Sequence, residues 1–250
     1  MTTAATIEQN APIVGGSRAI LGQFPHHVLL RRDSQDQLLC GGSIISDTWV
    51  LTAAHCVYNR TFVHMEFGTI DLYVDGVVMN SSTFFIHPKY KPSIVMDDVA
   101  LIKLPTPLKF NKNINVIPLV PSKDAKNDFV GKFGSVTGFG WPTDRAKRYS
   151  ERLLWGTVQV ISNKECAKKL KERAIEASSM CAVPYMGTNM SPCRGDSGGA
   201  LIWKNDEKRF VQIGIISSTK KNHCSEYPVA YARITSFLNY IRNITGLRFN

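Results

Sequence analysis

The segment SPCRGDSGGA, residues 191–200, places a serine among glycines, directly after an aspartate. A serine hydroxyl is a weak nucleophile at neutral pH and needs a neighbouring base, and histidine suits that role because its pKa lies near neutrality. The segment LTAAHC supplies His55, and DDVALIKL supplies Asp98 at the head of an apolar run. A buried carboxylate would fix the imidazole tautomer and stabilise the imidazolium. We therefore predict that His55, Asp98 and Ser197 form a catalytic triad; the alternative is a coincidental or decayed site.

The elements that must position these residues are short apolar runs separated by Gly, Asn, Asp and Pro. Runs rich in Val, Ile and aromatic residues indicate antiparallel strands, either closed into barrels or packed as a sandwich. The clearest of these runs are HHVLL, GSIIS, WVLTAAH, VALIKL, LLWGTVQVIS, ALIWK, FVQIGIIS and VAYARI.

Two segments have helical patterns instead. The first spans residues 163–176, and its inward-facing apolar side chains are expected to be Cys166, Leu170 and Ile175. The second, TSFLNYIRNI, opens with Thr235 and Ser236, which are good capping residues, and continues with apolar residues at helical spacing. We expect it to form a closing helix that docks on the body of the protein.

Several further motifs accompany the three catalytic candidates in a fixed order. They are IVGG at 13, CGGSII at 40, LTAAHC at 51, DVALIKL at 98, TGFG at 137, CRGDSGGA at 193 and PVAYARI at 228. From Ile13 to about Thr245 the sequence resembles the chymotrypsin family of serine endopeptidases, with a non-tryptic pocket of elastase-like or chymotrypsin-like type. The resemblance implies an all-β fold: two six-stranded antiparallel barrels with the active site between them, a short intermediate helix and a C-terminal helix.

The resemblance also implies a division of the chain. Residues 1–12 would be an N-terminal extension or propeptide, and 13–250 the serine protease domain. Within it we expect barrel one at about 24–110, a connector at about 111–128 inside a proline-rich stretch, barrel two at about 129–234 and the last helix at about 235–245.

Roles for neighbouring residues follow from the same resemblance. Gly195 and Ser197 would offer backbone N–H groups as an oxyanion hole, and Ser217 would support the triad aspartate. Proteolysis of a zymogen would free Ile13, whose ammonium would pair with Asp196 and order the oxyanion loop. Pro12 precedes Ile13 where the family usually has Arg or Lys, so a trypsin-like activator is not expected.

The residues around the expected specificity pocket are uncharged. Ser191 resembles the floor of that pocket, where an aspartate would attract Lys or Arg, so we predict no trypsin-like cleavage. Thr219 and Val229 add side chains where glycine leaves an open slot, which favours small or medium aliphatic residues. Glu226 facing the pocket is the alternative that would readmit basic residues. Arg194 is expected either to reach over the cleft entrance and favour acidic or polar residues, or to be a solvated surface residue.

The six cysteines permit fifteen pairings and include no C-x-x-C pair, which argues against zinc. The remaining histidines have no metal-site spacing, so we expect them on the surface or in loops, and we expect no metal or cofactor; they are His26, His27, His64, His87 and His223. The resemblance implies the disulfides Cys40–Cys56, Cys166–Cys181 and Cys193–Cys224.

Cysteine number and sequons favour a secreted glycoprotein. The sequons begin at Asn59, Asn80, Asn189 and Asn243, the third being discounted because it adjoins the expected active site. No apolar run is long enough to span a membrane. Residues 1–12 lack the features of a signal peptide, so we expect either that the signal was removed before this numbering begins or that Met1 was added for expression.

The formal net charge of +10 favours acidic partners. Two basic clusters could bind a polyanion, although a solvated face is the default interpretation; they contain Arg145, Lys147, Arg148 and Arg152, and Lys164, Lys168, Lys169, Lys171 and Arg173. Nucleic acid is not expected, because no aromatic residues are interleaved with the charges. We predict a secreted monomeric endopeptidase with protein or peptide substrates and protein inhibitors as partners. The alternative is a non-catalytic, polyanion-binding protein on the same scaffold.

Overall fold

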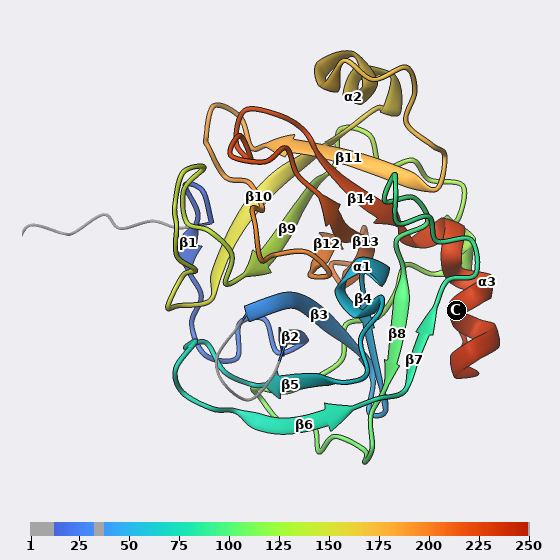
Figure 1. The fold of residues 1–250 in the computed structure, drawn as a ribbon. Helices are drawn as coiled ribbons and strands as arrows, with labels where there is room; N and C mark the ends of the chain where they lie inside the picture. Colours follow the sequence, from blue (N-terminus) through green and yellow to red (C-terminus); the bar gives the residue numbers. More distant parts are fainter. Residues whose placement is uncertain (1–12, 33–37, 250) are drawn as a thin grey trace, which may run out of the picture.

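The computed structural model describes residues 13–32 and 38–249, which form two antiparallel β-sheets and three α-helices (Figure 1). The predicted extension at residues 1–12, including Pro12, lies outside the described residues. No helix among the described residues is long and apolar enough to cross a membrane.

The first sheet has the strand order β6-β5-β2-β3-β4-β8-β7. Its strands are β2 (His27–Arg31), β3 (Leu38–Ser46), β4 (Trp49–Thr52), β5 (Val63–Phe67), β6 (Val77–Ser81), β7 (Phe84–Ile86) and β8 (Ala100–Lys103). The resemblance implied six strands, and the seventh arises because one edge segment is interrupted. β6 pairs with β5, and after a break at residues 82–83 the same segment continues as β7 and pairs with β8.

The second sheet has the order β1-β10-β11-β14-β13-β12-β9, and β9 also pairs with β10, so six of its strands close into a barrel. These strands are β9 (Phe133–Gly138), β10 (Leu154–Ile161), β11 (Ser179–Pro184), β12 (Ala200–Lys204), β13 (Phe210–Ser218) and β14 (Val229–Arg233). The seventh strand is the two-residue β1 (Ser17–Arg18), which adds to the outside of β10. The chain segment that precedes the first sheet is therefore tied to the second sheet.

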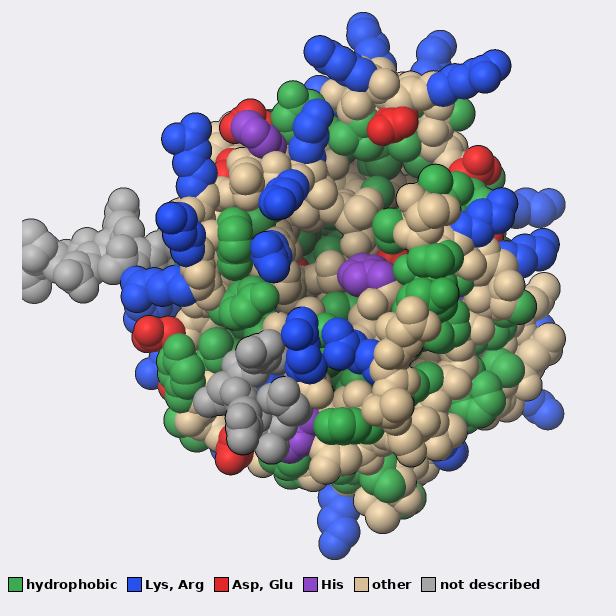
Figure 2. Space-filling model, in the orientation of Figure 1, with side chains coloured by type: hydrophobic (Ala, Val, Ile, Leu, Met, Phe, Trp, Pro, Cys, Tyr) green, Lys and Arg blue, Asp and Glu red, His purple; other side chains and the backbone are tan. Residues whose placement is uncertain are grey.

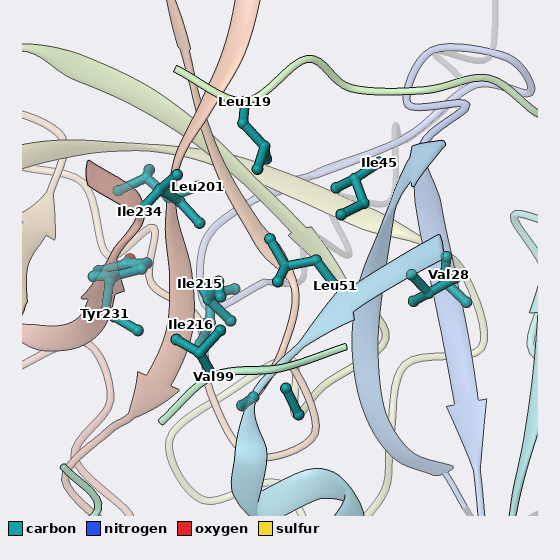
Figure 3. Close-up of a cluster of buried hydrophobic side chains, with 14 of the residues drawn as sticks. Val28, Ile45, Leu51, Val99, Leu119, Leu201, Ile215, Ile216, Tyr231 and Ile234 are labelled. Atoms are coloured by element: carbon teal, nitrogen blue, oxygen red, sulfur yellow. The ribbon is translucent and has the colours of Figure 1, made fainter. Parts of the chain in front are cut away.

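One continuous apolar core joins the two sheets. Figure 3 shows Leu51 from the first sheet in the same cluster as Ile215 and Ile216 from β13. A polar contact also crosses between the sheets, because the Ser43 hydroxyl donates to Gln212 Oε1 at 2.8 Å and both side chains are buried. The two sheets are thus joined by shared packing.

The helices are shorter or begin earlier than the sequence predicted. α2 (Asn163–Leu170) ends six residues before the expected boundary, because Lys171 adopts a left-handed conformation with φ of 59°. α3 (Ile234–Thr245) begins at Ile234, with Arg233 at the N-cap and no side-chain cap. The prediction that Thr235 and Ser236 cap this helix is therefore wrong; both lie in its first turn.

Two of the histidines are also placed differently from the prediction. His27 is buried at the start of β2, and His26, in the turn before β2, is buried rather than on the surface. Burial lowers the pKa of His26 to about 4 and, together with the neighbouring His26, that of His27 to about 3. The charged imidazolium would lose its hydration in this interior, so both rings are neutral at physiological pH.

Candidate active site

The three catalytic candidates come from both sides of the cleft. β4 leads into the one-turn helix α1 (Ala54–Val57), which carries His55. Asp98 lies just before β8, and Ser197 lies in the turn that leads into β12 of the second sheet. The surface is hollowed between the two sheets, and several Lys and Arg side chains lie around the hollow (Figure 2).

Asp98 holds His55 through two hydrogen bonds. The distance from His55 Nδ1 to Asp98 Oδ2 is 2.7 Å, and the His55 backbone N–H donates to Asp98 Oδ1 at 2.9 Å. The hydroxyl of Ser217, in β13, donates to Asp98 Oδ2 at 2.7 Å. The Asp98 side chain is 1% exposed and that of His55 is 31% exposed, so the ring has a buried, oriented edge and an edge open to the cleft. This is the arrangement that a general base needs.

Ser197 is adjacent to this pair without a direct hydrogen bond to it among the described residues. Cys56 Sγ lies 3.7 Å from both His55 Nε2 and the Ser197 carbonyl oxygen, and the Gly41 N–H donates to that carbonyl at 2.7 Å. The backbone of the serine is thus fixed beside the histidine. In enzymes without substrate the hydrogen bond from nucleophile to base is often long.

The turn around Ser197 depends on glycine at two positions. Gly195 has φ of +102°, and a Cβ at this position would lie 2.8 Å from the Tyr149 ring. Gly198 has φ of +83°, and a Cβ there would overlap the Gly41 carbonyl oxygen. The backbone N–H groups of Gly195 and Ser197 have no acceptor among the described residues, so both remain available to a ligand oxyanion.

Ile13 and Asp196 are both buried in the second barrel region. Asp196 Oδ1 accepts a hydrogen bond from Gly140 N at 2.7 Å, and Oδ2 accepts one from Cys193 N at 2.9 Å. Burial raises the pKa of Asp196 to about 7, against the opposing effect of these two bonds. Within residues 13–32 and 38–249, no cation pairs with this carboxylate. The adjoining Val14 is already docked, since its carbonyl accepts the Ser191 N–H at 3.3 Å.

The three residues assigned to the pocket differ in accessibility. Ser191 is 1% exposed, and its hydroxyl donates to the Cys224 carbonyl at 2.7 Å, so it contributes no charge and no free donor. Val229 is buried in β14. Thr219 is half-buried and lines a hollow of about 250 Å³ together with Leu170 and Glu172, and neither Ser191 nor Val229 lines that hollow. Glu226 is directed elsewhere, because its carboxylate pairs with His223 at 3.1 Å and its side chain is 57% exposed.

The structure contains the three disulfides that the resemblance implied: Cys40–Cys56 beside His55, Cys193–Cys224 beside Ser191, and Cys166–Cys181, which links α2 to β11. Two clusters of metal-ligand types occur among the described residues, one around Cys40 and Cys56 and one around Cys193 and Cys224. Both contain a disulfide, which has no thiolate to offer to a metal.

One contact between the loops near the proposed pocket was not predicted from the sequence. Asp144 Oδ1 accepts the Ser225 N–H at 3.0 Å, and Oδ2 accepts the Ser225 hydroxyl at 2.6 Å. Ser225 follows Cys224, whose carbonyl holds Ser191. The two partners are 81 residues apart. The only local signal was a turn-forming aspartate in a loop, which does not identify its partner.

Comparison with known proteins gives consistent matches over nearly the whole chain. A family model described as Trypsin matches residues 13–241. A collagenase of Hypoderma lineatum is 34% identical over 240 residues, covering 95% of this chain and 88% of the relative. A brachyurin of Leptuca pugilator is 34% identical over 239 residues, covering 94% and 99%. A solved structure described as HL collagenase superposes with a TM-score of 0.82 at 31% identity, covering 94% of this chain and all of that one.

Proposed function

The chain belongs to the trypsin family and is a serine endopeptidase, and from this premise we propose that His55, Asp98 and Ser197 carry out its acyl transfer. The observation that carries the proposal is a pair of hydrogen bonds to Asp98 Oδ2. It accepts one from the Ser217 hydroxyl and one from His55 Nδ1, at 2.7 Å each. A carboxylate with these partners fixes the ring so that Nε2 remains the basic atom.

In the proposed reaction, His55 Nε2 takes the Ser197 proton as Oγ attacks the scissile carbonyl. The negative charge that develops on the carbonyl oxygen is stabilised by the free N–H groups of Gly195 and Ser197. The imidazolium then gives its proton to the leaving amine, and an acyl-enzyme remains. Water, activated by the same histidine, hydrolyses that ester and restores the serine.

We propose that cleavage follows small or medium uncharged residues. Ser191 uses its hydroxyl within the protein, and the Glu226 carboxylate is solvated beside His223. A Lys or Arg side chain would therefore enter the pocket without a counter-charge, at a desolvation cost of several kcal/mol. We expect matched peptides with Ala, Val or Leu before the scissile bond to be cleaved and the arginyl peptide not to be. Appreciable arginyl turnover would overturn this specificity.

Activation is proposed to require a free Ile13. Its ammonium would pair with Asp196, which the uncleaved chain leaves without a cation within the described residues. A fluorophosphonate probe tests the proposal: we expect labelling of Ser197 only after Ile13 is exposed, and none in a Ser197→Ala variant. Failure to label the processed protein would favour the alternative, a non-catalytic protein on this scaffold.

Secretion and glycosylation are part of the same proposal. The three disulfides suit an oxidising compartment. The asparagines of all four sequons are exposed, namely Asn59, Asn80, Asn189 and Asn243. A mobility shift after treatment of the secreted protein with an N-glycosidase would show which fraction carries glycans.

Polyanion binding is a second candidate property, favoured by the basic residues of α2 and the segment after it. Lys164, Lys168, Lys171 and Arg173 are exposed there, and none of the four forms an ion pair within the described part of the chain. By contrast Lys169 lies 3.7 Å from Glu165, and Arg152 in the other cluster lies 2.9 Å from Asp71. Elution from heparin at no more salt than from a generic cation exchanger would exclude this property.

A further inference from the structure

The two sides of the cleft serve different parts of a substrate. The proposed pocket residues Ser191, Thr219 and Val229 belong to the second sheet and its loops, so the acyl part of a substrate lies against that side. The leaving amine takes its proton from His55, which the first sheet presents on α1. The substrate residues after the scissile bond must therefore leave across the rim formed by α1, the turn that follows it, and the ends of β2 and β3.

Arg60 lies on this rim, in the turn that follows α1, the helix that carries His55. Its Nε donates to the Cys56 carbonyl at 2.9 Å, and Cys56 is the residue after His55. This bond ties Nε of the guanidinium to α1, and its other nitrogens bond to none of the residues that the structure describes. Arg32, at the end of β2, contributes positive charge at the same place, since partial burial and the charge of Arg32 together lower the pKa of Arg60.

Arg194 adds a third cation at the point where the two barrels meet. Its carbonyl accepts the Trp141 N–H at 2.9 Å, and its guanidinium lies over the Trp141 ring at 5.3 Å from the centroid. It precedes Gly195, where a Cβ would lie 3.0 Å from the Leu38 side chain at the start of β3. Stacking on an aromatic ring restricts the guanidinium and leaves its edge open to a carboxylate.

No carboxylate neutralises these three cations within residues 13–32 and 38–249. Arg32, Arg60 and Arg194 take part in none of the ion pairs there. The Lys and Arg side chains around the hollow in Figure 2 agree with a positive rim. A substrate that brings carboxylates to this rim would bind more tightly through electrostatic attraction to all three cations.

We infer that the enzyme selects substrates with aspartate or glutamate in the first three positions after the scissile bond, through Arg60, Arg194 and Arg32. Three extended residues span about 10 Å, which suits a rim that begins one turn from His55. The inference rests on the proposed function and adds the substrate class on its leaving-group side.

The test uses two quenched fluorescent peptides that are identical except after the scissile bond. One carries Glu and the other Gln at the second and third positions. We expect kcat/KM to be about ten-fold higher for the Glu peptide at low salt, and the ratio to approach one at about 0.5 M salt, because exposed ion pairs are modest and screened. Arg60→Gln and Arg194→Gln should each lower the ratio two- to five-fold, and together should abolish the preference.

The ratio of the two peptides separates charge recognition from damage to the site, because damage lowers both rates. Arg60→Lys should retain most of the preference, and Arg248→Gln, an exposed change after α3, should alter neither rate. A ratio near one in the processed wild-type protein, or an unchanged ratio in the double variant, would overturn the inference alone. Absence of any cleavage, together with an unlabelled Ser197, would overturn the proposed function and the inference with it.

Discussion

At the scale of single residues, Asp196 is a buried carboxyl group that pairs with no cation among the residues that the structure describes. Its pKa is about 7 in the folded protein against 3.8 as the ordinary value. Between these pH values the folded state keeps a proton that the unfolded state releases, so this group lowers the free energy of unfolding as pH rises from about 4 to about 7. In the uncleaved protein, Asp196→Asn should therefore raise that free energy at pH 8 relative to wild type. The gain should be about 1–3 kcal/mol, because the amide nitrogen cannot accept one of the two backbone N–H groups that the carboxylate accepts. Urea unfolding at pH 4, 6 and 8 would measure it.

The matched control for this pH effect is Glu151→Gln, because Glu151 is exposed and belongs to no ion pair within the described residues. The free energy of unfolding of this variant should depend on pH as that of wild type does. After Ile13 is freed, Asp196→Asn should instead lower the free energy of unfolding relative to wild type, since the neutral amide offers the Ile13 ammonium no countercharge. Turnover should also be lost. Equal unfolding curves for wild type and Asp196→Asn at pH 8 would contradict the assigned burial cost.

At the scale of elements, the loop that contains Asp144 holds the loop that contains Ser225, which adjoins the proposed specificity pocket. Asp144→Ala removes both bonds to Ser225 and frees the segment whose Cys224 carbonyl holds Ser191. Bonds to a charged group of this kind contribute about 1–2 kcal/mol, so we expect KM to rise roughly five- to thirty-fold while kcat changes less. Steady-state kinetics on the Leu peptide would measure this. Asp206→Ala, an exposed change in the β12–β13 turn, is the control. An unaltered KM for Asp144→Ala would contradict the supporting role of the Asp144 loop.

The elements also show what sequence could and could not predict. The long Val- and Ile-rich runs, such as those of β10 and β13, are the strands that the pattern predicted. β9 and β11 lack a long apolar run and were not identified, because barrel closure rather than local propensity makes them strands. The candidate triad lay in motifs that are local in sequence. The pairing of Asp144 with Ser225 depends on how two loops meet, and no local pattern contains that information.

At the scale of the whole molecule, the two barrels share one core. This shared core affects whether activity and structure are lost together when the protein unfolds. Buried side chains of both sheets belong to one cluster, with Leu51 beside Ile215 and Ile216 (Figure 3). The catalytic candidates are likewise divided, since His55 belongs to the first barrel and Ser197 to the second. If the barrels unfold as one body, activity and secondary structure should disappear together.

Leu51→Ala tests this coupling because it opens a cavity where the two barrels touch. Removal of this fully buried side chain should lower the free energy of unfolding by about 2–5 kcal/mol, and urea curves followed by activity and by far-ultraviolet circular dichroism should still coincide. Leu21→Ala provides the control, since Leu21 is 52% exposed and should change stability little. Two separated transitions, with activity lost while half of the strand signal persists, would show that the barrels fold independently and that their shared core does not couple them.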